Sequence, residues 1–106
     1  MQSQILRANV ARVINAIPYG RNHAIPREKL VQETGLPDRQ VRRCIEEARR
    51  SGTLIANRQD GSGYYQTIDL AEIEKQYRQD TARAMSILAR RRTERKILAA
   101  NGWKVD

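Results

Sequence analysis

The sequence predicts a mainly α-helical protein with one small β-hairpin and a long helix near its C-terminal end. Apolar residues recur at helical spacing through most of residues 3–51. Two runs rich in β-forming residues, 53–57 and 64–68, flank a loop that contains glycine. From residue 70 to about residue 100 the helical spacing returns. The expected order is therefore helix, short strand, helix, helix, hairpin and long helix.

The first predicted helix runs from Ser3 to Ile17, with Ser3 as its expected N-cap. Its apolar residues fall on one face, at Leu6, Val10, Val13, Ile14 and Ile17. The Pro-Tyr-Gly run at 18–20 ends this helix, because proline and glycine interrupt helical geometry. A short extended segment is expected at 23–25.

Two shorter helices follow this segment. Proline suits the first turn of a helix, so residues 26–34 predict a second helix, which Gly35 ends as a left-handed C-cap. A third helix opens at Pro37-Asp38 and runs to about Ser51. The third helix is expected to bury one face only, formed by Val41, Cys44, Ile45 and Ala48.

Residues 58–63 join the two β-forming runs, and their two glycines suit a hairpin loop. Successive side chains of a strand point to opposite faces. We therefore expect one of Tyr64 and Tyr65 to pack on the core and the other to be exposed. The hairpin completes a first domain, residues 1–68.

The remaining chain predicts a long basic helix at 69–100 and a loose tail at 101–106. One straight apolar stripe follows the helix, formed by Leu70, Ile73, Tyr77, Thr81, Ala84 and Leu88. This stripe could pack back on the first domain or pair with the same helix of a second copy, giving a homodimer. Beyond the stripe, basic residues lie at Arg90, Arg91, Arg92, Arg95 and Lys96. Their mutual repulsion, offset only by an Arg90–Glu94 pair, favours an anionic partner.

Composition restricts the classes of function. The 106 residues carry a formal net charge of +8, which favours a polyanionic partner. One cysteine and one histidine exclude an internal disulfide and a zinc site, and no catalytic or phosphate-binding motif is present. No apolar stretch is long enough to cross a bilayer. The expectation is a cytoplasmic, non-enzymatic protein without a cofactor.

The second helix, the Gly35-Leu36 turn and the third helix form a predicted helix-turn-helix. With a strand before it and a hairpin after it, the element order over residues 6–68 resembles the winged helix-turn-helix family. The run 36–43, the Gly-Tyr-Tyr at 63–65 and the later segment 84–88 resemble small winged-helix proteins of phages and prophages. The chain departs from that pattern at Pro37, where Ser or Thr is usual, so the first contact residue of the third helix is open.

The resemblance implies that the third helix enters the major groove of double-stranded DNA. The residues then facing the bases are Asp38, Arg39, Arg42 and Arg43, with Gln40 at the edge. In the hairpin loop, the wing, the functional interpretation places Arg58 on the DNA backbone or in a minor groove, with Ser62 donating to phosphate. The basic end of the long helix offers Arg90, Arg91 and Arg92 to phosphates.

The candidate contact residues of the third helix, the wing and the long helix could each instead form an ordinary solvated surface. In the third helix, Arg42–Glu46 and Arg43–Glu47 are opposite-charge pairs that could stabilise it in isolation. The expected function is sequence-specific DNA binding in the transcription, replication or recombination of a phage-type element. The alternative is an adaptor that recruits a protein partner, because a winged-helix fold does not determine function.

Overall fold

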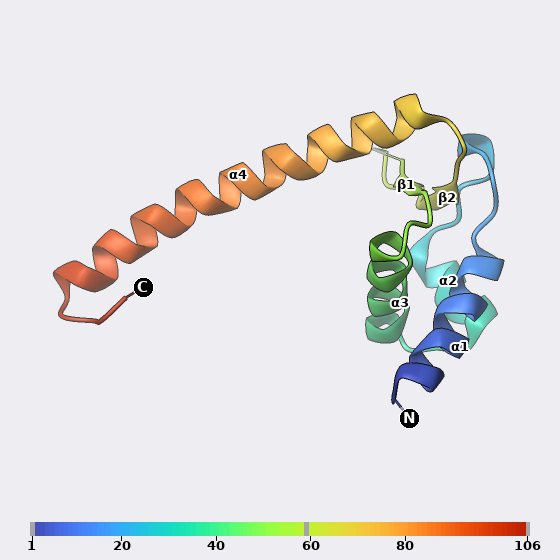
Figure 1. Ribbon diagram of the computed structural model, residues 1–106, viewed down its shortest axis with the longest axis horizontal. Coiled ribbons are helices and arrows are strands. Elements are labelled where there is room, and N and C mark those ends of the chain that lie inside the picture. The colour runs from blue at the N-terminus through green and yellow to red at the C-terminus, as the bar shows by residue number, and fades with distance from the viewer. Residues whose placement is uncertain (1, 59, 106) are drawn as a thin grey trace. The chain divides into compact units, whose positions relative to one another are not determined.

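A computed structural model describes residues 2–58 and 60–105 of the chain. The helices are α1 (Gln2–Ala16), α2 (Arg27–Thr34), α3 (Asp38–Arg50) and α4 (Leu70–Ala100), with a short 3-10 helix at Arg21–His23. Strands β1 (Ile55–Asn57) and β2 (Tyr64–Gln66) pair antiparallel (Figure 1). Within the described residues, the predicted mainly α-helical fold with one small hairpin is confirmed.

The chain forms two compact units, Met1–Ile73 and Glu74–Asp106. The first unit contains α1, α2, α3, the hairpin and the first turn of α4. The second contains the rest of α4 and the residues after it.

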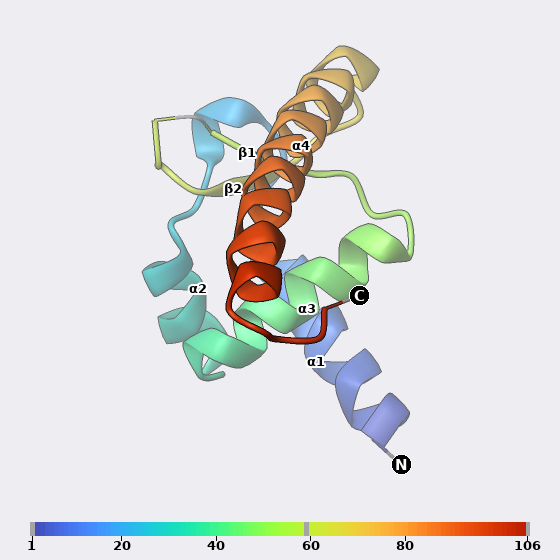
Figure 2. The same ribbon diagram turned by 90° about the vertical axis from the view of Figure 1, so that its left-hand side faces the viewer.

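The core of the first unit lies between α1, α2 and α3, each of which contacts the other two (Figures 1 and 2). The predicted apolar face of α3 is buried at all four positions, Val41, Cys44, Ile45 and Ala48. The other core residues are Val13, Ile17, Ile25, Leu30, Leu36 and Ile55. Burying one face of α3 completely leaves its opposite face to solvent.

The turn between α2 and α3 forms as the sequence predicts. Gly35 has a φ of 72°, and its backbone N–H donates to the carbonyl oxygen of Val31 at 2.9 Å. Pro37 is the N-cap of α3, and its carbonyl oxygen accepts from the N–H groups of Gln40 (2.9 Å) and Val41 (3.0 Å). The third helix therefore begins at Asp38, without a side-chain cap.

The hairpin is shorter than predicted, with Ile55 opposite Gln66 and Asn57 opposite Tyr64. Tyr65 is buried as expected of one of the pair, but the expected exposure of the other is wrong, because Tyr64 is half-buried against the core. The far edge of β2 is also covered, because Tyr64 bridges to Ile25 and Gln66 bridges to Tyr19.

Two local predictions are wrong. The helix α1 begins at Gln2, so Ser3 lies inside its first turn and not at the N-cap. The segment 23–25 is not a strand, because His23 ends the 3-10 helix and only Ile25 makes a bridge. Ile25 reaches this bridge through two backbone hydrogen bonds with Tyr64, at 2.8 and 2.9 Å. The extended geometry at this point therefore depends on a partner far along the chain.

The first turn of α4 is fixed by side chains of the first unit. Asp69 is its N-cap, and its Oδ1 accepts from the N–H of Ala71 at 2.9 Å. The Glu72 carboxylate accepts hydrogen bonds from the hydroxyls of Tyr65 and Thr67. At the other end α4 stops before Asn101 and Gly102 as predicted, and Gly102 has a φ of 84°.

Candidate nucleic-acid interface

The exposed side of α3 carries a line of arginines. At 3.6 residues per turn, Arg39, Arg43 and Arg50 lie opposite the buried apolar face, and all three are exposed. Glu46 shares this line and forms a 3.7 Å ion pair with Arg49. The outer face of α3 is therefore basic, with one acidic residue along it.

The arginines of this face differ in whether acidic side chains form ion pairs with them. Arg39 and Arg43 form no ion pair with any of residues 2–58 and 60–105. Arg50 contacts Glu47 at 3.2 Å, yet 72% of its side chain remains exposed. Since Arg39 and Arg43 are one turn apart and carry like charges, an anion between them would relieve their repulsion.

The alternative pairs Arg42–Glu46 and Arg43–Glu47 do not form among the described residues. Arg42 instead pairs with Asp38 at 3.1 Å, and the two glutamates pair at i, i+3 with Arg49 and Arg50. Asp38 lies four residues before Arg42 on the same helix, so this pair has the same spacing as the one it replaces.

Asp38 links α2 to α3. Its Oδ1 accepts a 2.6 Å hydrogen bond from Nε of Arg27, and its Oδ2 lies 3.1 Å from Nε of Arg42. The hydrogen bond to Asp38 raises the pKa of the Arg27 guanidinium above its ordinary value. Both carboxylate oxygens are therefore engaged, and the arrangement makes Asp38 a positioning residue for Arg42.

Gln40 lies at the edge of the arginine face. Its Oε1 accepts a 3.3 Å hydrogen bond from the Asn9 side chain of α1. Gln40 and Arg43 border a small hollow of about 220 Å³ between α1 and α3, whose other lining residues are Ile5, Leu6, Asn9 and Cys44. Burial raises the pKa of the Cys44 thiol, so this thiol is held in its neutral form.

The two predicted contact residues of the wing lie together, and both contact Asp60. Arg58 pairs with Asp60 at 2.8 Å and donates to the carbonyl oxygen of Arg21 at 3.4 Å. Both the hydroxyl and the N–H of Ser62 donate to Asp60, the N–H at 3.0 Å. These hydrogen bonds from Ser62 lower the pKa of the Asp60 carboxyl. Asp60 thus already accepts from the wing's two predicted contact residues, Arg58 and Ser62.

The basic end of α4 belongs to the second unit. Arg90, Arg91 and Arg92 are exposed, and the expected Arg90–Glu94 ion pair is absent from the described part of the chain. Residues 74–106 contain nine basic and four acidic residues, a net charge of +5. Residues 1–73 contain eleven basic and eight acidic residues, a net charge of +3. Most of the excess positive charge therefore lies in less than a third of the sequence.

Two arginines of α3 were not predicted as site residues from the sequence, and their surroundings differ. Arg50 continues the periodicity of Arg39 and Arg43, so the same helical spacing could have identified it. Arg49 joins α3 to β1, because it donates to the carbonyl oxygen of Ile55 (3.2 Å) and to Oδ1 of Asn57 (2.6 Å). Its guanidinium also lies 5.9 Å from the ring centre of Tyr64. These contacts cross two elements, and no local pattern indicates them.

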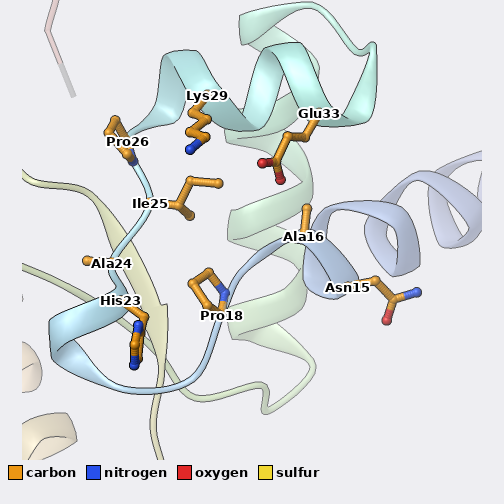
Figure 3. Close-up of a pocket in the computed structure, with 9 residues that line it drawn as sticks. All are labelled: Asn15, Ala16, Pro18, His23, Ala24, Ile25, Pro26, Lys29 and Glu33. Atoms are coloured by element: carbon orange, nitrogen blue, oxygen red, sulfur yellow. The ribbon is translucent and has the colours of Figure 1, made fainter.

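An open groove of about 430 Å³ lies elsewhere on the first unit (Figure 3). Ile25 lies in its middle, with Lys29 and Glu33 of α2 on one side and Ala16 and Pro18 on the other (Figure 3). Among the described residues, no three His, Cys, Asp or Glu side chains are grouped to hold a metal ion. None of the described helices combines the length and apolar character that crossing a bilayer requires.

No family model matches the chain, and searches of the curated proteins and of the solved structures found no match.

Proposed function

We propose that this protein is a non-enzymatic, sequence-specific double-stranded-DNA-binding protein of the winged helix-turn-helix type. The observation that carries the proposal is the outer face of α3, where Arg39 and Arg43 are exposed and unpaired among the described residues. The opposite face of the same helix is fully buried, which holds these arginines outward. An α-helix fits the major groove of DNA, and a guanidinium can donate two hydrogen bonds to O6 and N7 of guanine.

The residues around this pair take supporting roles in the proposal. Asp38 directs Arg42 along the helix surface, where Arg42 can contact a phosphate. Gln40 can exchange its hydrogen bond with Asn9 for a bidentate pair with adenine. In the wing, a phosphate has to replace Asp60 as the acceptor for Arg58 and Ser62. The wing is therefore the weaker of the two contacts.

The basic end of α4, with Arg90, Arg91 and Arg92, supplies sequence-independent affinity for phosphates in this proposal. The exposed apolar stripe of α4 supports a homodimer as the species that binds. The biological role that fits best is the control of transcription, replication or recombination in a phage or prophage. This role rests on the resemblance in sequence pattern over residues 6–68.

The first test is the replacement of Arg43 by alanine. The preferred duplex is selected from a random pool, and its dissociation constant is then measured for wild-type and Arg43→Ala protein. We expect a roughly 5- to 150-fold weaker complex, equivalent to about 1–3 kcal/mol, with little change on random duplex. Arg43→Lys keeps the charge but loses the planar fork, so it should restore affinity without restoring sequence preference.

The control for Arg43→Ala is Arg78→Ala, which removes the same charge from α4, where Arg78 pairs with Glu74 at 2.7 Å. An equal loss in both variants would attribute the effect to net charge and contradict a contact by α3. An absence of duplex binding at about 50–100 mM salt would contradict the whole proposal.

A second function, an adaptor that recruits another protein, is favoured by one observation. Several large apolar side chains of α4 are exposed, including Tyr77 at 69% and Met85 at 58%. If the protein is an adaptor, surface substitutions on α4 should abolish binding of the protein partner, while Arg43→Ala should leave that binding intact. The duplex-binding measurement therefore separates the two functions.

A further inference from the structure

The part of α4 in the second unit has an apolar surface that no other helix or strand described in that unit covers. The whole helix runs for 31 residues (Figure 1), and none of its residues is classed as buried. Along its stripe, Leu70 is 72% exposed, Tyr77 69% and Leu88 47%. A helix with so little burial gains almost nothing from tertiary packing, although packing is the main source of helix stability in proteins. A partner packed along this stripe would supply the missing stabilisation.

The charges of α4 are divided unevenly along its length. Residues 70–80 contain three acidic and two basic residues, a net charge of −1. Residues 81–100 contain six basic residues and one acidic residue, a net charge of +5. In a parallel pair, the two strongly basic segments would lie side by side and repel one another. In an antiparallel pair with the stripes overlaid, their centres are roughly 35 Å apart, several screening lengths in physiological salt.

The sizes of the stripe residues favour the same orientation. Reversing one stripe against the other places Tyr77 opposite Thr81, and Ile73 opposite Ala84. Large side chains then meet small ones, and Leu70 meets Leu88 at both ends of the contact. A parallel pair would oppose Tyr77 with Tyr77 and Ala84 with Ala84, which crowds one level and leaves a gap at another. The stripe is therefore complementary to itself when it is reversed.

From these observations we infer that the partner of this stripe is a second copy of the chain, with the two α4 helices antiparallel. The inference rests on the homodimer of the proposed function and specifies its orientation. The interface is isologous, since each copy contributes the same residues. It leaves Arg90, Arg91 and Arg92 of each copy outside the overlaid stripes, one basic segment at each end of the paired helices.

Oligomeric state in the absence of DNA tests the surface. We expect sedimentation equilibrium to give a dimer mass for the wild-type protein over about 1–100 µM, and a monomer mass for Leu88→Glu. Ser86→Glu is the matched control, because it adds the same charge to the opposite side of α4 and should remain a dimer. A monomeric wild type, or a dimer that Leu88→Glu leaves intact, would overturn the inference.

Crosslinking tests the orientation. Two tagged variants, Leu70→Cys and Leu88→Cys, are prepared in a Cys44→Ala background and treated with a short bismaleimide, separately and mixed. An antiparallel pair gives the mixed crosslink between the two variants and little crosslink within either. Crosslinks within each variant alone would indicate a parallel pair and overturn the orientation. Because DNA is absent from both experiments, their failure leaves the contact by α3 to be judged by Arg43→Ala.

Discussion

Tyr65 shows how burial sets the behaviour of a single residue. Its phenol lies on the buried side of β2, where desolvation and the hydrogen bond to Glu72 raise its pKa to about 12. The folded state thus holds the phenolic proton more tightly than the unfolded state, whose pKa is about 10. The resulting stabilisation is complete below pH 10 and is lost as the pH rises from about 10 to about 12.

We therefore predict that Tyr65→Phe flattens the alkaline dependence of stability. Over that pH range the wild type should lose about 2–3 kcal/mol more unfolding free energy than the variant does. Urea unfolding at a series of pH values measures the difference. Tyr19→Phe is the control, because Tyr19 is 64% exposed and the same chemical change there should leave the profile as in the wild type. If wild type and Tyr65→Phe showed the same dependence of unfolding free energy on pH, the Tyr65 phenol would not be its cause.

Gly63 is the position where the backbone admits no side chain. Its φ is 116°, and a Cβ built there would lie 1.9 Å from the carbonyl oxygen of Ile25. We predict that Gly63→Ala lowers the unfolding free energy by about 2 kcal/mol or more, since strain and collision act together. Gly61→Ala shares the positive φ but meets no atom within 4 Å, so it should cost only about 1 kcal/mol. Equal costs in urea unfolding would show that the contact with Ile25 is unimportant.

Side-chain pairing shows why residue contacts are only partly predictable. The burial of one tyrosine of the pair follows from strand alternation and is confirmed for Tyr65, whereas the expected exposure of the other is wrong, because Tyr64 packs against the core. The partner of Arg42 does not follow, because Asp38 and Glu46 both lie four residues from Arg42 along α3 and only Asp38 pairs with it. Spacing along a helix therefore identifies candidate pairs but does not decide among them.

At the scale of elements, the start of α4 depends on an N-cap residue, Asp69, that was not predicted from the sequence. Asp69 and Glu72 have the spacing of an N-cap followed by an acidic third residue, which is a helix-start pattern. Asp69 caps the helix, whereas the carboxylate of Glu72 accepts from Tyr65 and Thr67. One short stretch therefore both starts the helix and ties its first turn to β2.

We predict that Asp69→Ala lowers the unfolding free energy by about 1 kcal/mol and frays the first turn of α4. Hydrogen exchange of the amides of residues 71–73 should accelerate in this variant, because Ala71 loses its acceptor. Asp69→Ser retains an acceptor and should behave like the wild type. Unchanged exchange in Asp69→Ala would mean that Tyr65 and Thr67 alone fix the turn.

Elements with local signals were predicted well. The end of α2 at Gly35, the start of α3 after Pro37 and the end of α4 before Asn101 each carry a capping or breaking residue. The segment before α2 carries no such signal, and its single bridge at Ile25 is made by Tyr64, some forty positions later. Pairing over such a separation is invisible to a window of neighbouring residues.

At the scale of the whole molecule, the proposed DNA-binding function assigns affinity and sequence preference to different parts of the charge distribution. If four to six phosphates are neutralised per copy, the logarithm of the binding constant should fall with the logarithm of salt with a slope of about −4 to −5. In the proposed function, α4 would be the main source of that slope, because residues 74–106 carry a net charge of +5.

We predict that removing Arg91 and Arg92 together, by alanine substitution, reduces this slope by about 2 and weakens all duplexes alike. The matched control removes Lys75 and Arg78, two cations from the less basic half of the same helix. Salt titrations of duplex binding compare the two double variants. An equal reduction in both would show that net charge, and not the position of the basic segment, sets the slope.

The candidate interface was only partly predictable. The arginines of α3 follow from helical periodicity, since the buried face determines which side chains point away from it. The state of the wing does not follow, because Asp60 engages both Arg58 and Ser62 within the loop. A loop with two glycines and a cation is compatible with phosphate binding and with self-closure, and composition does not distinguish them.

The covered edge of β2 has a consequence for the order in which the protein folds during synthesis. The Gln66 side chain donates to the carbonyl oxygens of Ile14 (3.0 Å) and Ile17 (2.9 Å) at the end of α1. A ribosome delivers these acceptors about fifty residues before it delivers their donor. Contacts between such distant positions form late, because closing the intervening chain costs entropy. The carbonyl oxygen of Ile14 also accepts from the nearby N–H of Ile17 (3.0 Å), whereas the carbonyl oxygen of Ile17 stays hydrated until the hairpin has left the exit tunnel.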